Sequence, residues 1–137
     1  MKKIMPLLAL AVMFGACSVS TANVSVVSMC PTLAQGEMTC ATDTATFVSN
    51  TPEIFITTQL DNAPTGTKVT FQWRYLEGSA PEVIDSVVVE SPEVSPSYPN
   101  SSLPIPPGGL WPAGKYDVVV SLDTDNSEPI VKAFVVK

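Results

Sequence analysis

The sequence of 137 residues contains no histidine. This absence removes the commonest general base of enzymes, the usual catalytic triads and most metal sites. The chain also lacks a G-x-S-x-G nucleophile elbow and a glycine-rich phosphate loop. Its 13 Asp and Glu residues could supply an acid–base pair, but nothing in the sequence selects two of them. We therefore predict that the protein is not an enzyme and that it binds no metal ion or cofactor.

Basic residues are scarce. Seven Lys and Arg residues face 13 Asp and Glu residues, which gives a formal net charge of −6. Lys2 and Lys3 lie in an N-terminal segment that we expect to be removed, which leaves five basic against 13 acidic side chains and a charge of −8. Such a surface repels nucleic acid and anionic lipid head groups, because binding to either depends on basic patches. We expect no nucleic-acid partner.

No apolar run reaches the 18 or more residues of a membrane-spanning helix. The longest run, residues 4–14, has a helical length of about 16 Å, roughly half of a bilayer core. It follows Lys2 and Lys3 and precedes the small residues Gly15 and Ala16. This order is typical of a secretory signal peptide and predicts that the protein is exported.

The end of this segment carries a more specific signal. The run Phe14-Gly15-Ala16-Cys17 resembles the lipobox of bacterial lipoproteins. The resemblance implies that residues 1–16 are a signal peptide and that Cys17 becomes a lipid-carrying N-terminus that tethers the protein to the membrane. Ser18 stands where enterobacterial lipoproteins of the inner membrane carry Asp, which favours the outer membrane over the inner. The alternative is ordinary cleavage after Ala22, which would yield a soluble periplasmic or secreted protein.

Cys30 and Cys40 remain after either cleavage. An even number of thiols in an oxidising compartment predicts a disulfide, worth roughly 3 kcal/mol by loop-closure entropy. A metal site would need two further soft ligands. We assign residues 17–43 to a tether that holds this disulfide loop and that extends to at most about 90 Å. On this assignment, reduction would loosen the loop and leave the folded domain intact.

Residues 44–137 show the two-residue alternation of β-strands. In residues 68–76, Val69, Phe71, Trp73 and Tyr75 point one way and polar residues the other. Residues 82–90 place Val83, Asp85, Val87 and Val89 on one face. Twelve prolines follow the signal peptide, and no helical periodicity is evident. We expect strands at residues 44–49, 53–61, 68–76, 82–90, 97–103, 115–122 and 129–136, with a further short strand possible at 24–28.

Two stretches resemble immunoglobulin-like and fibronectin-III-like domains. Leu110-Trp111-Pro112-Ala113-Gly114-Lys115-Tyr116 is similar to the entry of a strand with a tyrosine corner, in which the Tyr hydroxyl bonds to upstream backbone. Trp73 is similar to the core Trp of these domains. The resemblance implies an all-β fold, an antiparallel Ig-like sandwich of about seven strands, for residues 44–137. It carries no functional residue across.

Residues 91–112 combine seven prolines with large apolar side chains. Proline lowers the entropy cost of ordering a loop, and apolar groups on such a loop make good contact anchors. Trp111 is expected to be structural, because it lies beside the tyrosine corner. The alternative is that the other apolar residues also cover one end of the core. The candidate binding residues are Tyr98, Leu103, Ile105 and Leu110.

Taken together, these features predict a lipid-anchored cell-envelope binding or assembly module without catalytic activity. Its partners would be the membrane, through the N-terminal lipid, and another envelope or secreted protein. Two alternatives stay open: a structural accessory lipoprotein of an envelope complex, and a small inhibitor of a hydrolase.

Overall fold

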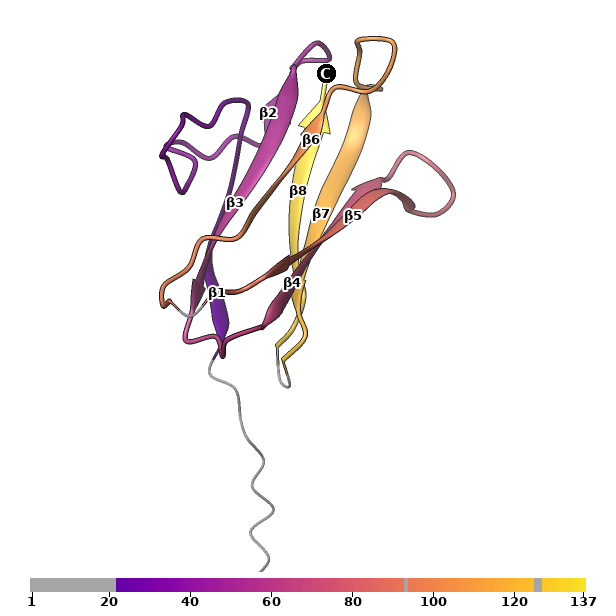
Figure 1. Ribbon diagram of the computed structural model, residues 1–137. Coiled ribbons are helices and arrows are strands. Elements are labelled where there is room, and N and C mark those ends of the chain that lie inside the picture. The colour runs from indigo at the N-terminus through magenta and orange to yellow at the C-terminus, as the bar shows by residue number, and fades with distance from the viewer. Residues whose placement is uncertain (1–21, 93, 125–126) are drawn as a thin grey trace, which may run out of the picture.

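The computed structural model describes residues 22–92, 94–124 and 127–137. Two β-sheets lie face to face, and the described residues form no helix (Figure 1). One sheet has the order β1-β3-β6 and the other β2-β8-β7-β4-β5. All pairs are antiparallel except β2 with β8. The strands are β1 (Asn23–Cys30), β2 (Thr46–Phe47), β3 (Glu53–Asp61), β4 (Lys68–Tyr75), β5 (Glu82–Glu90), β6 (Asn100–Pro104), β7 (Gly114–Leu122) and β8 (Ile130–Val136).

This architecture confirms the predicted all-β Ig-like sandwich, with eight strands in place of about seven. The expected bounds of the strands at 53–61 and 82–90 agree with β3 and β5. In the described part of the chain no helix has the length and hydropathy needed to cross a bilayer.

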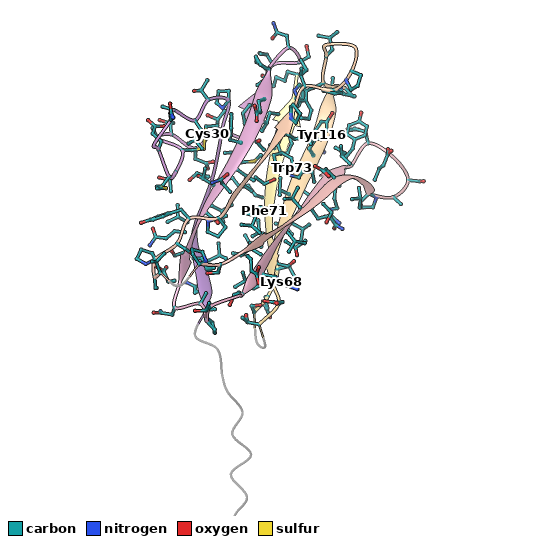
Figure 2. All side chains as sticks on the ribbon, viewed as in Figure 1. Cys30, Lys68, Phe71, Trp73 and Tyr116 are labelled. Carbon is teal, nitrogen blue, oxygen red and sulfur yellow. A yellow bond between two sulfur atoms is a disulfide. The ribbon has the colours of Figure 1, made fainter. Side chains whose placement is uncertain are left out.

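The core lies between the inner faces of the two sheets (Figure 2). The alternation expected for β4 is confirmed, because Val69, Phe71 and Trp73 are fully buried. The Trp73 indole contacts Phe134 edge-on at 6.0 Å between ring centroids, and its Nε1–H donates to Ser101 Oγ at 3.1 Å. The ring contact lies within the five-stranded sheet, and the hydrogen bond joins Trp73 of β4 to Ser101 of β6 in the other sheet.

Tyr116 forms the predicted tyrosine corner. Its hydroxyl donates a hydrogen bond of 2.6 Å to the carbonyl of Pro112, four residues upstream. The ring stacks on Phe134 at a centroid distance of 5.0 Å and meets the edge of Trp111 at 6.1 Å. Trp111 is buried, and its Nε1–H donates to the Thr51 carbonyl at 2.8 Å. The structural role expected for Trp111 is therefore confirmed.

The boundary between tether and sandwich requires a correction. β1 lies within the segment assigned to the tether, yet it pairs with β3 along its whole length, from Asn23 with Asp61 to Cys30 with Phe55. The sandwich therefore begins near residue 23 and not at residue 44. The sequence pattern is weak here because a bulge between Val24 and Val26 interrupts the alternation. As a result Val24, Val27 and Met29 face the core at uneven spacing.

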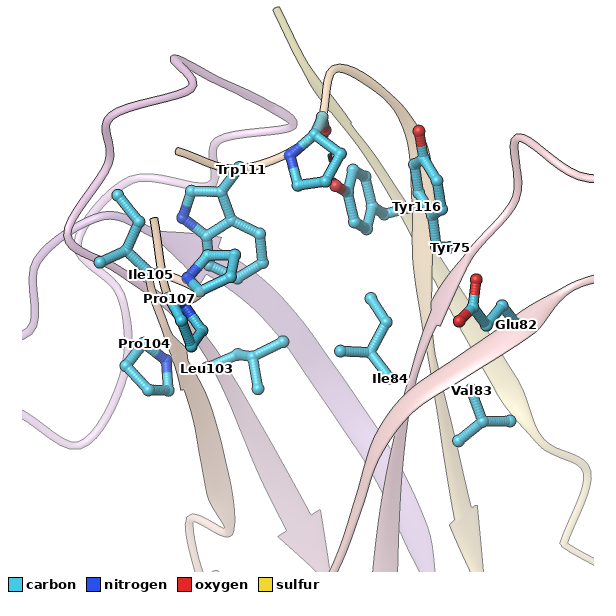
Figure 3. Close-up of a pocket in the computed structure, with 12 residues that line it drawn as sticks. Tyr75, Glu82, Val83, Ile84, Leu103, Pro104, Ile105, Pro107, Trp111 and Tyr116 are labelled. Carbon is cyan, nitrogen blue, oxygen red and sulfur yellow. Dashed lines mark hydrogen bonds between the residues drawn. The ribbon is translucent and has the colours of Figure 1, made fainter. Parts of the chain in front are cut away.

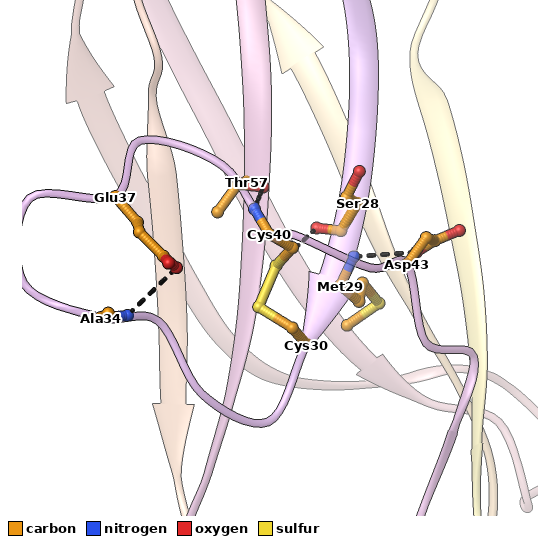
Figure 4. The surroundings of a disulfide bond; sticks show 8 residues. All are labelled: Ser28, Met29, Cys30, Ala34, Glu37, Cys40, Asp43 and Thr57. Atoms are coloured by element: carbon orange, nitrogen blue, oxygen red, sulfur yellow. Dashed lines mark hydrogen bonds between the residues drawn. A yellow bond between two sulfur atoms is a disulfide. The ribbon is translucent and has the colours of Figure 1, made fainter.

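The predicted disulfide between Cys30 and Cys40 is present, with the Cα atoms 5.8 Å apart (Figure 4). The loop that it closes folds back onto the β1–β3 pair, where the Cys40 amide donates to Thr57 Oγ1 at 3.0 Å. Further along, Asp43 Oδ1 accepts from the Met29 amide at 2.9 Å, and the Thr44 amide donates to the Met29 carbonyl. The two bonds to the Met29 main chain cover the edge of β1 before the chain crosses to β2 in the other sheet.

Candidate binding site

An apolar cavity of about 600 Å³ opens between the edge strands of the two sheets (Figure 3). β5 is the outermost strand of the five-stranded sheet on this side, and β6 is the outermost strand of the other. Pro104 in the cavity wall pairs with Glu53, at the end of β3 opposite the Asp61–Asn23 pair. The cavity therefore lies at the end of the sandwich away from Asn23.

The proline-rich segment forms one wall of the cavity. Leu103 and Ile105 are half-buried and line the cavity while also packing against the core. Backbone hydrogen bonds hold the segment to residues 49–52, from the Ile105 amide to the Pro52 carbonyl at 2.8 Å and from the Trp111 amide to the Ser49 carbonyl at 2.7 Å. This wall is thus attached to the sandwich by main-chain bonds on both sides of its turn.

A β-bulge in β5 shapes the opposite wall. Trp73 pairs with Asp85 and Arg74 pairs with Val83, so Ile84 is an extra residue in β5. The bulge turns Ile84 toward Leu103 across the opening, whereas Val83 points away (Figure 3). The sequence analysis placed Val83 on the face shared by Val87 and Val89. That placement is wrong, because the extra residue reverses the alternation beyond Asp85.

Aromatic rings form the floor. Tyr75 and Tyr116 lie at 4.7 Å between ring centroids. The Tyr75 hydroxyl donates to the Ala113 carbonyl at 3.0 Å, while the Tyr116 hydroxyl and the Trp111 indole N–H donate to other carbonyls. Because their polar atoms are engaged, these residues offer ring surface to a ligand. Glu82 is the one charged side chain in the described lining. The arrangement suits contact with an apolar group.

The candidate residues do not form a single site. Leu103 and Ile105 come together in the cavity, whereas Tyr98 lines a separate cavity of about 220 Å³ beside Glu90. Leu110 is 59% exposed and lies outside the lining. Cys17 is outside the described residues. The binding role of the four anchors stays a prediction.

Sequence reasoning missed the contributions of Tyr75, Glu82 and Ile84 to the cavity. No local pattern marks Ile84, because adjacent apolar residues also occur at Val87 and Val88 of the same strand, where the pairing is regular. Nothing in the sequence indicated that β5 and β6 would border the same opening.

Among the residues that the structure describes, no group of three or more Cys, Asp or Glu side chains is placed to hold a metal ion. Two ion pairs occur there, between Arg74 and Asp117 and between Lys132 and Asp43. The first is bidentate, with bonds of 2.7 and 2.6 Å. It lies on the outer face of the five-stranded sheet, because Arg74 follows the inward-facing Trp73.

We expect Ile105 and Leu110 to differ in their effect on stability. Ile105→Ser should lower the free energy of unfolding by about 1–2 kcal/mol, because a half-buried side chain loses its contacts with the core. Leu110→Ser should change it by less than about 0.5 kcal/mol, as is usual for exposed positions. Thermal melts of the two variants test this. Equal shifts in Tm would contradict the assignment of Ile105 to the wall and of Leu110 to the surface.

The raised pKa of Tyr116 predicts that the folded protein loses stability at high pH. Burial, with a smaller effect of the nearby Tyr75, raises the pKa of Tyr116 to about 12. An unfolded Tyr ionises near pH 10, so this contribution is complete below about pH 10 and is lost as the pH rises to about 12. The contribution is at most about 2–3 kcal/mol, because the hydroxyl is only partly buried and solvent screens the effect.

Urea melts of the wild type and of Tyr116→Phe between about pH 9 and pH 12 measure this contribution. Phe retains the ring but has no proton to lose, so the stability gap between the two proteins should narrow as the pH rises. The two proteins differ only in the Tyr116 hydroxyl, so a change of the gap with pH reports on this group. A gap that stays constant across this range would refute the assignment.

Comparison with known proteins gives matches by structure only. No protein-family model matches the chain, and no curated protein does. A β-glucosidase from Erythrobacter marinus superposes with a TM-score of 0.50 at 10% identity, over 85% of this chain and 15% of the β-glucosidase. A β-glucosidase from Listeria innocua in complex with gluconolactone gives 0.49 at 11% identity, over 84% and 15%.

One chain from a structure that addresses T cell specificity and activation by the bacterial superantigen toxic shock syndrome toxin-1 gives a TM-score of 0.43 at 10% identity. The match covers 84% of this chain and 98% of that one. The present chain thus spans about one seventh of each β-glucosidase. At 10% identity the match to the Erythrobacter marinus β-glucosidase concerns the fold alone.

Proposed function

We propose that the protein is a lipid-anchored binding or assembly module of the cell envelope that acts without catalysis. The observation that carries this proposal is the apolar opening between β5 and β6, at the end of the sandwich away from Asn23. Apolar cavities with few polar groups are the usual form of ligand and partner sites. The single carboxylate of the described lining supports binding over catalysis, since acid–base hydrolysis needs two carboxylates at a defined separation.

The position of β1 limits the distance between the proposed lipid on Cys17 and the sandwich. Five residues lie between Cys17 and Asn23, so the six Cα-to-Cα steps that join them extend at most about 21 Å. This is far less than the reach expected for a tether of residues 17–43. The nine residues of β3 span about 26 Å between the end near Asn23 and the end near the cavity. A lipid on Cys17 would therefore hold the sandwich close to the membrane with the opening directed away from it, where an envelope or secreted protein can reach it.

The anchor is tested by Cys17→Ser. The variant should lose incorporation of labelled palmitate and leave the membrane fraction, because the thiol is the site of lipid attachment. Fractionation of cells grown with the labelled fatty acid provides both readouts. Sedimentation and labelling equal to those of the wild type would exclude lipid attachment at Cys17.

Binding at the opening is tested in intact cells with a photo-crosslinking amino acid in place of Ile84. The matched control carries the same group in place of Val131, which is similarly exposed (57% against 43%) and lies in β8 of the same sheet. We expect an adduct of discrete size from position 84 and none from position 131. The absence of an adduct at position 84, or the same adduct at both, would overturn the proposal.

A further inference from the structure

The two strands that border the opening are uniformly acidic or neutral. β5 contributes Glu82, Asp85 and Glu90 and no basic residue, and β6 has no charged residue at all. Lys68 pairs in register with Glu90 at the opposite end of β5, and two further cations are turned away or engaged. Lys115 precedes the inward-facing Tyr116 and so points to the outer face of β7, and Arg74 is bonded to Asp117. A ligand at this opening therefore meets negative charge, and opposite charge on the ligand favours association.

The opening is shaped for an extended chain. β5 runs for nine residues without proline, and in the described part of the chain no strand pairs with its outer edge. β6 is shorter, has five residues and ends in Pro104, which cannot donate a main-chain hydrogen bond. An extended segment added to the β5 edge would gain main-chain hydrogen bonds, and its alternate side chains would point to the inner side. One of them would reach the cavity beside Ile84.

The β5 edge also carries two features that discourage indiscriminate pairing. These are the bulge at Ile84 and the half-buried Asp85, which shares the inner face with Trp73. Both are common on edges that must not aggregate. A strand that pairs with this edge must place cations or hydrogen-bond donors beside the carboxylates of β5. The edge therefore favours basic segments and disfavours pairing with other strands.

We propose that the β5 edge and the adjoining cavity bind an extended segment of a partner protein that carries one large apolar side chain flanked by Lys or Arg. The apolar group occupies the space between Ile84 and Leu103, and the cations lie against Glu82 and Asp85. This inference rests on the proposed function, because it names the partner class of the same opening.

Labelled peptides test the inference on the mature protein, purified from whichever cell fraction holds it. In acetyl-Lys-Thr-Leu-Thr-Lys-amide, the Leu and both Lys side chains lie on one side of an extended strand. The comparison peptides replace both Lys by Glu, or Leu by Ser. Fluorescence anisotropy should give a Kd at least about tenfold lower for the Lys-Leu peptide than for either comparison peptide.

Two variants locate the site. Glu82→Lys should weaken binding of the Lys-Leu peptide about tenfold and strengthen binding of the Glu peptide, and Ile84→Ser should weaken both. The matched control is Val131→Ser, which changes an exposed aliphatic residue elsewhere on the sheet and should leave each Kd unchanged. Thermal melts establish that each variant is folded.

Equal affinity for the Lys and Glu peptides, or a preference that Glu82→Lys does not alter, would overturn the inference. So would a loss of binding in Val131→Ser as large as that in Ile84→Ser. If no peptide binds while crosslinking from position 84 still captures a partner in cells, the inference fails and the proposed function stands.

Discussion

Replacing Trp73 by Ala should lower the free energy of unfolding by about 3–5 kcal/mol, the range found when large aromatic residues are truncated in cores. The side chain is fully buried, and its ring is held edge-on against Phe134. Truncation leaves a void between the two sheets and removes the donor for Ser101 Oγ. Because small domains have a total stability of about 5–15 kcal/mol, the variant should approach global unfolding at ambient temperature.

Urea melts of the mature protein and of Trp73→Ala measure this difference, and Trp73→Phe is the matched control. Phe fills most of the space but cannot donate to Ser101, so its cost should fall clearly below that of Ala. A cost below about 1 kcal/mol for Trp73→Ala would contradict the burial of this residue and the register of β4.

Removing the disulfide by the double change Cys30→Ala and Cys40→Ala should cost about 3 kcal/mol, the loop-closure value for a loop of this length. The sequence analysis expected this loss to affect only an N-terminal loop. The structure corrects that expectation, because Cys30 is the last residue of β1 and the neighbouring Met29 is fully buried in the core. Reduction should therefore weaken the attachment of β1 and lower the stability of the sandwich itself.

Urea melts with and without reductant test this, and intact mass should rise by two hydrogens on reduction. The matched control is Met38→Ser, which changes an exposed residue inside the same loop and should cost less than about 0.5 kcal/mol. A midpoint that does not respond to reductant would show that β1 is held without help from the covalent bond.

How far the sequence anticipates this fold depends on whether the information is local. In β3, β4 and β7 the large apolar residues recur at every second position, so the faces that bury Ile54, Phe71 and Val118 could be predicted from the chain. The tyrosine corner is equally local, because the Tyr116 hydroxyl bonds to a carbonyl four residues upstream. The disulfide could be predicted from the number of thiols left in a chain that we expect to be exported.

The sequence by itself thus determined the fold class, most strands and their inner faces, since a side chain's burial follows from the period of its strand. Only the tertiary structure decided that β1 belongs to the sandwich, that β2 pairs parallel with β8, and that β5 and β6 border one cavity. The bulges at Val24–Val26 and at Ile84 shift the alternation and hide the inner faces of β1 and of the start of β5 from a periodicity argument. The meeting of two edge strands is a contact between residues far apart in the chain, which no local pattern records.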